Sequence, residues 1–240
     1  AALRVCCGPS PSRTPKVCGG CPLPLLTPEM RLRMGHAAVT LAQSVCSTNA
    51  GKVEVLVDQK GNYYFIEMNT RIQVEHTITE EVYGCDLVKE QIHIAAGNKL
   101  SPHVAKPMAR SHAIQGRINA EDPARNFQPS AGRINFYYAP GGRGVRIDSH
   151  AYTGYTVPPY YDSMIAKVIA VGATRASAIA RMRRALGEYL ITGIKTTIPF
   201  HNAIMRNADF RNGNYDTGFV ARMMKSEAFE LRPSNGSLRD

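Results

Sequence analysis

The stretch that decides the fold is KVEVLVD at residues 52–58, followed by a short polar segment and then YYFIEMN at residues 63–69. Both runs are rich in β-branched and aromatic residues, and the first alternates valine with other side chains. Between them lies QKGN at residues 59–62, a composition typical of turns. The pattern predicts a β-hairpin.

The hairpin register determines which side chains face each other. If Lys60 and Gly61 form a two-residue turn, or residues 59–62 a four-residue turn, paired residues have numbers that add up to 121, and Glu54 lies opposite Glu67. Such carboxylates repel by about 3 kcal/mol at an effective dielectric near 20. Mg²⁺ would remove this repulsion because it prefers carboxylate oxygens, and Asn69 continues the same face with a neutral oxygen. Two alternatives stay open: both glutamates face solvent, or a three-residue turn shifts the register and removes the pairing.

Past Asn69 the same alternation predicts an extended ribbon. Arg71, Gln73 and Glu75 would then share the face of Glu67. Carboxylates for a metal, an arginine and a spare carboxylate are the groups that phosphoryl chemistry requires. Any half-solvated strand shows the same polar alternation, so the pattern alone leaves the function open.

The remaining sequence predicts an α+β fold with two packed units. Thr27-Pro28-Glu29 is a helix start, and helical spacing of apolar residues continues to about Val45. Asp86 is predicted to cap a second helix that Gly97 ends. A candidate boundary lies in residues 98–110. Beyond it we expect strands over 112–119, 132–138, 145–149 and 163–171, and helices over 175–190, 198–205 and 217–224.

Composition excludes few classes of function. The 240 residues contain 44% hydrophobic and 20% charged residues, typical of a globular protein, and no apolar run is long enough to span a membrane. The formal net charge of +10 favours anionic partners. A nucleic-acid-binding module is one alternative, but the arginines are scattered along the chain and the glutamates of the hairpin would repel phosphate. We therefore expect neither a nucleic acid nor a membrane as a partner.

Residues 1–26 differ from the rest of the chain. They contain four of the six cysteines and almost no periodicity, and we expect them to be poorly ordered. Cys18-Gly19-Gly20-Cys21 has the spacing of half a zinc site or of a redox pair, but no second pair follows at finger spacing. The spread of cysteines in the main body favours an intracellular protein, in the cytoplasm, a mitochondrion or a plastid.

The run FIEMNTRIQVEH at residues 65–76 resembles the end of the ATP-grasp fold in biotin carboxylases, which serve acetyl-CoA, propionyl-CoA and pyruvate carboxylases. Further blocks agree in the same order, and the similarity covers residues 27–224. These blocks are DLVKEQ at 86–91, GRINAEDP at 116–123, APGG at 139–142, GYTVPPYYDSMIAK at 154–167 and IKTT at 194–197. The resemblance implies four regions: an atypical segment (1–26), the C-terminal part of an ATP-grasp domain (27–108), a biotin carboxylase C-terminal domain (109–225) and a tail (226–240).

The resemblance also implies roles for the hairpin. Glu54 and Glu67, assisted by Asn69, would hold Mg²⁺ or Mn²⁺ on the phosphates of ATP, and Glu54, Leu56 and Glu67 would contact the nucleotide. The following residues would bind bicarbonate and activate it. These are Arg71, Gln73, Val74 and Glu75, with Glu75 as the base and Arg71 as a catalytic cation.

In the second half of the reaction, carboxyphosphate would release carbon dioxide to biotin. Arg117 would stabilise the biotin enolate, and Gln73, Tyr161 and Asp162 would line the biotin pocket. Arg143 and Arg146 correspond to part of the family's dimer contact. The implied partners are a biotin carboxyl carrier, a carboxyltransferase and a second copy of the chain.

Some features depart from the family. Nothing here resembles the glycine-rich lid over ATP or the lysines on its phosphates, and Lys52 and Val55 stand where the family usually has a small hydroxyl residue and an aromatic. We therefore expect the 240 residues alone to turn over little or nothing. A non-catalytic fragment that packs or dimerises is the second alternative.

Overall fold

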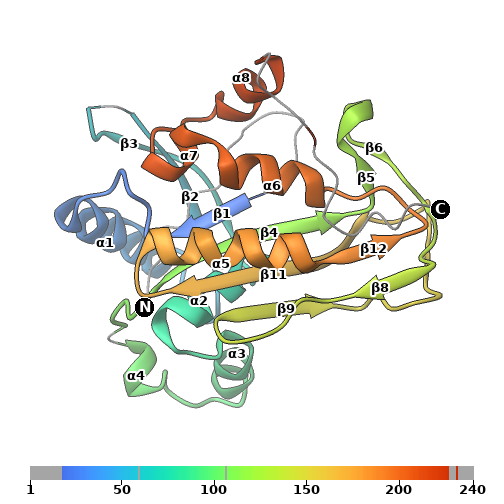
Figure 1. Cartoon of the computed structure of the whole chain (residues 1–240). Coiled ribbons are helices and arrows are strands. Elements are labelled where there is room, and N and C mark those ends of the chain that lie inside the picture. Colours follow the sequence, from blue (N-terminus) through green and yellow to red (C-terminus); the bar gives the residue numbers. More distant parts are fainter. Residues whose placement is uncertain (1–17, 59, 106, 227–230, 232–240) are drawn as a thin grey trace. The chain divides into compact units, whose positions relative to one another are not determined.

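A computed structural model describes residues 18–58, 60–105, 107–226 and 231 (Figure 1). These residues divide into two compact units. The first unit contains residues 21–112, and the second contains residues 18–20 and the chain from Ala113 onward. The division falls two residues beyond the predicted boundary segment. The prediction that the first residues are poorly ordered falls, for residues 1–17, outside the described residues, and so does most of the predicted tail.

The first unit begins with helix α1 (Pro28–Ser44), whose N-cap Thr27 accepts a hydrogen bond from the amide of Met30 at 3.2 Å. The hairpin of β2 (Lys52–Val57) and β3 (Tyr63–Asn69) follows. Helices α2 (His76–Tyr83), α3 (Leu87–Ala95) and α4 (Pro102–Ala105) complete it. Asp86 caps α3 by accepting from the amide of Lys89 at 2.8 Å, so both predicted caps are confirmed.

The hairpin pairs Glu54 with Glu67 as predicted, but the register between this pair and the turn differs from the predicted one. Next to the turn, Val57 pairs with Tyr63 and Val55 with Phe65, which is shifted by one residue from the predicted register. Asp58 produces this shift because its carboxylate accepts from the amides of residues 60 and 62 at 2.9 and 2.8 Å, and Gly61 has φ = +82°. A β-bulge then inserts Ile66, and the pairing of Glu54 with Glu67 is restored.

The second unit is built on a four-stranded sheet with the order β1-β4-β11-β9. Its strands are β1 (Cys18–Cys21), β4 (His112–Asn119), β11 (Met164–Gly172) and β9 (Val145–Ser149). The expectation that residues 1–26 lack structure is wrong for residues 18–26, since β1 joins this sheet and Cys18 and Cys21 are buried. Both are free thiols, and burial raises the pKa of Cys18 to about 12, which keeps this thiol protonated.

Short strands form two-stranded ribbons beside this sheet. The predicted strand over 132–138 is divided into β7 (Gly132–Arg133), which pairs with β10 (Thr156–Val157), and β8 (Phe136–Tyr138), which pairs with β12 (Leu190–Thr192). Leu190 is therefore in a strand and not in the predicted helix, because it pairs with Tyr138. The remaining ribbon joins β5 (Glu121–Asp122) to β6 (Gln128–Pro129), with the 3₁₀ turn Pro123–Arg125 between them.

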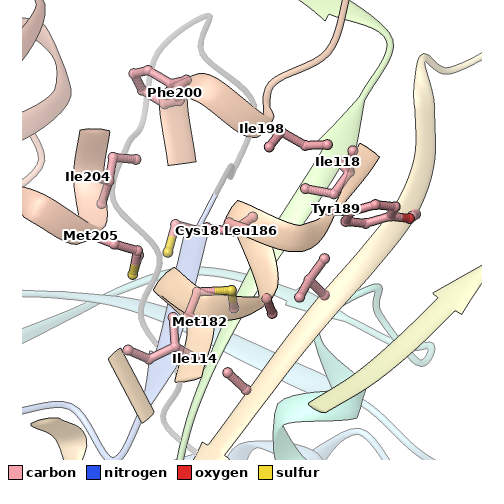
Figure 2. Packing of buried hydrophobic residues seen from close by; sticks show 14 of the residues in the cluster. Cys18, Ile114, Ile118, Met182, Leu186, Tyr189, Ile198, Phe200, Ile204 and Met205 are labelled. Carbon is pink, nitrogen blue, oxygen red and sulfur yellow. The ribbon is translucent and has the colours of Figure 1, made fainter. Parts of the chain in front are cut away.

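Helices cover the sheet of the second unit and enclose its core. Helix α5 (Arg175–Glu188) packs on β11, and α6 (Ile198–Arg206), α7 (Ala208–Asn212) and α8 (Phe219–Lys225) follow it (Figure 1). Figure 2 shows side chains of β4, α5 and α6 converging with Cys18 of β1. Burial of this apolar surface fixes the positions of β4 and α6. No helix in the described ranges combines the length and apolar character that a membrane crossing requires.

Candidate functional site

Two glutamates face each other across the hairpin of the first unit. Glu54 on β2 and Glu67 on β3 are direct cross-strand partners, so their side chains lie on the same face. Glu67 is exposed, and its Oε1 accepts a hydrogen bond from the side-chain Nδ2 of Asn69 at 2.8 Å, whereas the Glu54 side chain is only 14% exposed. The arrangement brings two carboxylates and one carboxamide together on one surface.

Lys52 supplies a positive charge on this surface. Its Nζ lies 3.3 Å from Glu54 Oε1 and also forms a close ion pair with Glu75 Oε1. Burial alone would lower the pKa of Lys52, but the hydrogen bond and charge of Glu75, together with Glu54, outweigh it and raise the pKa. Lys52 is therefore a cation that connects two carboxylates distant in sequence.

The expected extended ribbon beyond Asn69 is wrong. Strand β3 ends at Asn69, a turn closed by the hydrogen bond from His76 N to Gln73 O at 3.0 Å follows, and Glu75 becomes the N-cap of α2. The missed signals for α2 were the apolar Ile78 and Val82 at helical spacing and the glycine after Tyr83. Despite the turn, Gln73 Nε2 donates to Glu54 Oε1 at 3.3 Å, so Gln73 and Glu75 both reach the β2 surface.

A cavity of about 450 Å³ opens beside this cluster within the first unit. Lys52, Arg71, Gln73 and Glu75 all contribute to its wall. The Arg71 guanidinium is exposed and donates to the carbonyl of Ile72 at 3.2 Å. This part of the cavity wall thus combines two cations with an amide and a carboxylate, a set suited to a small oxyanion next to a base.

Two other predicted residues of this unit lie apart from the cavity wall. Val74 is half-buried in the turn before α2 and does not line the cavity. Leu56 pairs with Tyr64 on the hairpin, and its side chain is 44% exposed. An exposed apolar side chain on this strand offers a surface for a flat ring.

In the second unit, Arg117 lies on β4 and its backbone is held firmly. Its carbonyl accepts hydrogen bonds from His201 Nε2 at 2.7 Å and from Thr197 Oγ1 at 3.1 Å, and Thr197 Oγ1 accepts from the amide of Asn119 at 3.0 Å. Sequence reasoning did not select Thr197 or His201. The only signal available was two polar residues four apart at the start of an apolar helix.

His201 makes the stability of this unit sensitive to acid. It is fully buried, and burial lowers its pKa to about 4 despite the bond to the Arg117 carbonyl. The folded state favours neutral His201, so His201 does not reduce the free energy of unfolding above pH 6.5. As the pH falls from 6.5 to 4, protonation of this histidine in the unfolded state lowers the free energy of unfolding by about 3 kcal/mol. Urea unfolding at pH 7.5 and 4.5 should show a smaller acid-induced loss of stability in His201→Gln than in the wild type.

The control for this prediction is the exposed His150, because His150→Gln removes a histidine from the same unit without changing its buried polar groups. It should retain the acid sensitivity of the wild type. Equal losses of stability in the wild type and His201→Gln would show that another group causes the acid sensitivity.

The other residues predicted in the second unit lie on its surface. Tyr161 is 81% exposed, and exposed Asp162 accepts from the amide of Met164 at 2.8 Å. Arg143 is exposed. These three side chains are accessible to a ligand or a partner. Their roles in biotin binding and in a dimer contact stay predictions.

Arg146 is held on β9 by a charge network. It forms two hydrogen bonds to Asp148 at 2.8 and 3.1 Å, and Lys167 Nζ lies 3.2 Å from the same carboxylate. Burial alone would raise the pKa of Asp148, but the hydrogen bonds and charges of Arg146 and Lys167 lower it. The network fixes the direction of the Arg146 side chain.

The hairpin residues fit a hard divalent cation. Carboxylates from neighbouring strands with an added amide oxygen are the ligands Mg²⁺ prefers, and Glu67 is open to solvent, which leaves room for water or phosphate oxygens. Lys52, on the same face, opposes a cation. In the described part of the chain, no group of three or more histidine, cysteine, aspartate or glutamate residues is suited to hold a metal, so the candidate set depends on two carboxylates.

Comparison with known proteins agrees with this organisation. Residues 115–222 match the model of the biotin carboxylase C-terminal domain, and residues 4–103 match the ATP-binding domain of the carbamoyl-phosphate synthase L chain. The second match begins 23 residues before Thr27, so it includes most of the segment 1–26 that was expected to be atypical and to precede the ATP-grasp part of the chain.

Individual relatives are similar over most of the chain. A biotin carboxylase of Nostoc sp. is 54% identical over 89% of this chain and 48% of its own length, and biotin carboxylase 1 of Bacillus subtilis is 54% identical over 83% and 44%. The dimeric biotin carboxylase domain of Hydrogenobacter thermophilus 2-oxoglutarate carboxylase, solved with MgADP, ADP and bicarbonate, superposes with a TM-score of 0.84 at 46% identity, over 87% of this chain and 46% of that one. The chain spans about half the length of these relatives. It belongs to the biotin carboxylase family and carries the family's C-terminal domain with part of the ATP-binding domain.

Proposed function

We propose that this chain provides the base, the metal ligands and the biotin-facing arginine of an enzyme that carboxylates biotin with ATP and bicarbonate. The observation that carries the proposal is the convergence of Glu54, Gln73 and Glu75 around Lys52, beside a cavity that Arg71 also lines. These groups are far apart on an extended chain. The turn before α2 brings them together.

The first step requires a nucleophile made from bicarbonate. Arg71 and Gln73 would bind the anion in the cavity, with the backbone of Val74 in the turn between Gln73 and Glu75. Glu75 would accept the bicarbonate proton, and the freed oxygen would attack the γ-phosphorus of ATP as the bond to ADP breaks. Mg²⁺ or Mn²⁺, bound by Glu54 and Glu67 with Asn69, would neutralise phosphate charge. Leu56 would contact the nucleotide along with these glutamates.

The second step uses residues of the C-terminal domain. Carboxyphosphate would break into phosphate and carbon dioxide, the released phosphate would accept the proton of the biotin ureido nitrogen, and that nitrogen would form a bond to the carbon of carbon dioxide. Arg117 would stabilise the negative charge on the ureido oxygen, an electrostatic role that requires a fixed cation. The hydrogen bonds from His201 and Thr197 to the Arg117 carbonyl fix the backbone from which this side chain extends. Gln73, Tyr161 and Asp162 would contact biotin.

Partners follow from the same chemistry. Biotin would arrive on a carboxyl carrier protein or domain and leave toward a carboxyltransferase. Arg143 and Arg146 are proposed as part of a dimer contact, supported by the dimer of the Hydrogenobacter domain and by the network that holds Arg146. We place the parent enzyme inside the cell, in the cytoplasm or an organelle.

The test is ATP hydrolysis that depends on bicarbonate and is stimulated by free biotin. Two proteins are compared: the 240-residue chain, and a full-length chimera in which the part of the Nostoc relative that precedes its match is joined to this chain. The chain alone is expected to show little or no turnover, and the chimera to show biotin-stimulated turnover. A folded chimera without such turnover, beside an active Nostoc enzyme, would refute the proposal.

A further inference from the structure

Lys52 stands between two functional carboxylates, and the proposed function uses it neither as a metal ligand nor as a catalytic group. It lies on the same face of β2 as Glu54, two residues earlier, and its own cross-strand partner is Asn69. Lys52, Glu54, Glu67 and Asn69 therefore form one four-residue patch. Three of these residues are the proposed metal ligands, and the fourth is a cation.

Lys52 contacts carboxylate oxygens of a proposed metal ligand, Glu54, and of the proposed base, Glu75. Its Nζ lies 3.3 Å from Glu54 Oε1, the oxygen that Gln73 also approaches, and it pairs closely with Glu75 on the other side. The Lys52 side chain is only 21% exposed, and the two glutamates are 14% and 16% exposed. An ion pair so shielded is screened less than one on an open surface.

A divalent cation and the Lys52 ammonium need the same Glu54 carboxylate. A dication bound by Glu54 and the nearby Lys52 ammonium repel each other, and by Coulomb's law this repulsion lowers the affinity for the dication about tenfold or more. Lys52 can still remain on Glu75 when it leaves Glu54, because the two contacts lie on different carboxylates.

We propose that Lys52 sets the divalent-cation affinity of the Glu54–Glu67 pair by competing for Glu54, while its contact with Glu75 holds the base beside that pair. Lys52 is thus a positioning and affinity-determining residue, and the inference rests on the proposed function only for the roles of the glutamates. Cation binding shifts Lys52 from two carboxylates to one.

The experiment is a titration of the 240-residue chain with Mn²⁺ alone, followed by electron paramagnetic resonance of free Mn²⁺. Lys52→Thr and Lys52→Met remove the charge, and threonine also suits a strand. Both variants should bind Mn²⁺ about tenfold more tightly than the wild type, whereas Lys52→Arg should stay within about twofold of it. Adding Glu54→Gln to Lys52→Thr should abolish the gain.

The matched control is Lys60→Thr, which removes an exposed positive charge from the turn of the same hairpin. A gain as large as that of Lys52→Thr would show that only overall charge matters and would overturn the proposal. Affinities of both charge-removing variants within twofold of the wild type, or no Mn²⁺ binding by any variant, would also overturn it. If the Lys52 variants bind Mn²⁺ more tightly as expected but the full-length chimera shows no biotin-stimulated turnover, the carboxylase proposal is refuted and the proposal for Lys52 stands.

Discussion

Replacing Glu75 by glutamine in the full-length chimera should lower bicarbonate-dependent ATP hydrolysis by about 100-fold or more, with and without biotin. General-base catalysis contributes about that factor or more, and glutamine keeps the shape of the side chain but cannot accept the proton. Glu75 is suited to the role because the turn before α2 places it at the cavity wall beside Arg71 and Gln73. Rates are measured by phosphate release at saturating ATP and bicarbonate.

The control for Glu75 is Glu81→Gln, a charge removal further along α2 at a position that does not line the cavity. It should keep the rate within about threefold of the parent. A Glu75→Gln chimera that retains more than a tenth of the parental rate, with an unchanged thermal unfolding midpoint, would remove Glu75 as the base.

Replacing Arg117 by methionine should lower the biotin-stimulated rate by about 100- to 1,000-fold, the cost of removing one fixed donor to a developing negative charge. The slower bicarbonate-dependent hydrolysis without biotin should remain, because Arg117 acts on biotin and not on phosphate. This difference separates Arg117 from Glu75, whose loss should affect both rates. A merely structural role for Arg117 would lower both rates together.

The matched control for Arg117 is Arg125→Met. The Arg125 side chain is 77% exposed and lies in the 3₁₀ turn after β5 in the same unit. The Arg125→Met substitution should leave the rates with and without biotin unchanged. Equal loss of both rates in Arg117→Met would contradict a specific role toward biotin.

The hairpin shows how far local sequence can predict this site. Alternation and turn composition predicted the two strands, and Glu54 does pair with Glu67. The sequence left the length of the turn open, and Asp58, which accepts hydrogen bonds from two amides of the turn, shifts the register by one residue. The bulge at Ile66 cancels that shift. Correct pairing therefore results from two irregularities, neither of which has a periodic signal.

Long-range contacts account for most of what the sequence did not reveal. The strand over 18–21 has almost no periodicity of its own, and it is ordered because β4 pairs with it and the core buries Cys18. Likewise, Lys52 and Glu75 are 23 residues apart, and His201 and Arg117 are 84 apart. Propensity describes only neighbours along the chain, so these pairs appear once the tertiary structure is known.

The most direct measurement follows oxygen from bicarbonate into phosphate. The full-length chimera is given ¹⁸O-labelled bicarbonate and unlabelled water with ATP and biotin, and the phosphate is analysed by mass spectrometry before the bicarbonate exchanges with water. If an oxygen of bicarbonate attacks the γ-phosphorus with Glu75 as base, each phosphate formed in biotin-dependent turnover carries one ¹⁸O. Unlabelled phosphate at the same turnover would mean that water attacks ATP, and would contradict the assignment of the Glu75 cavity to bicarbonate.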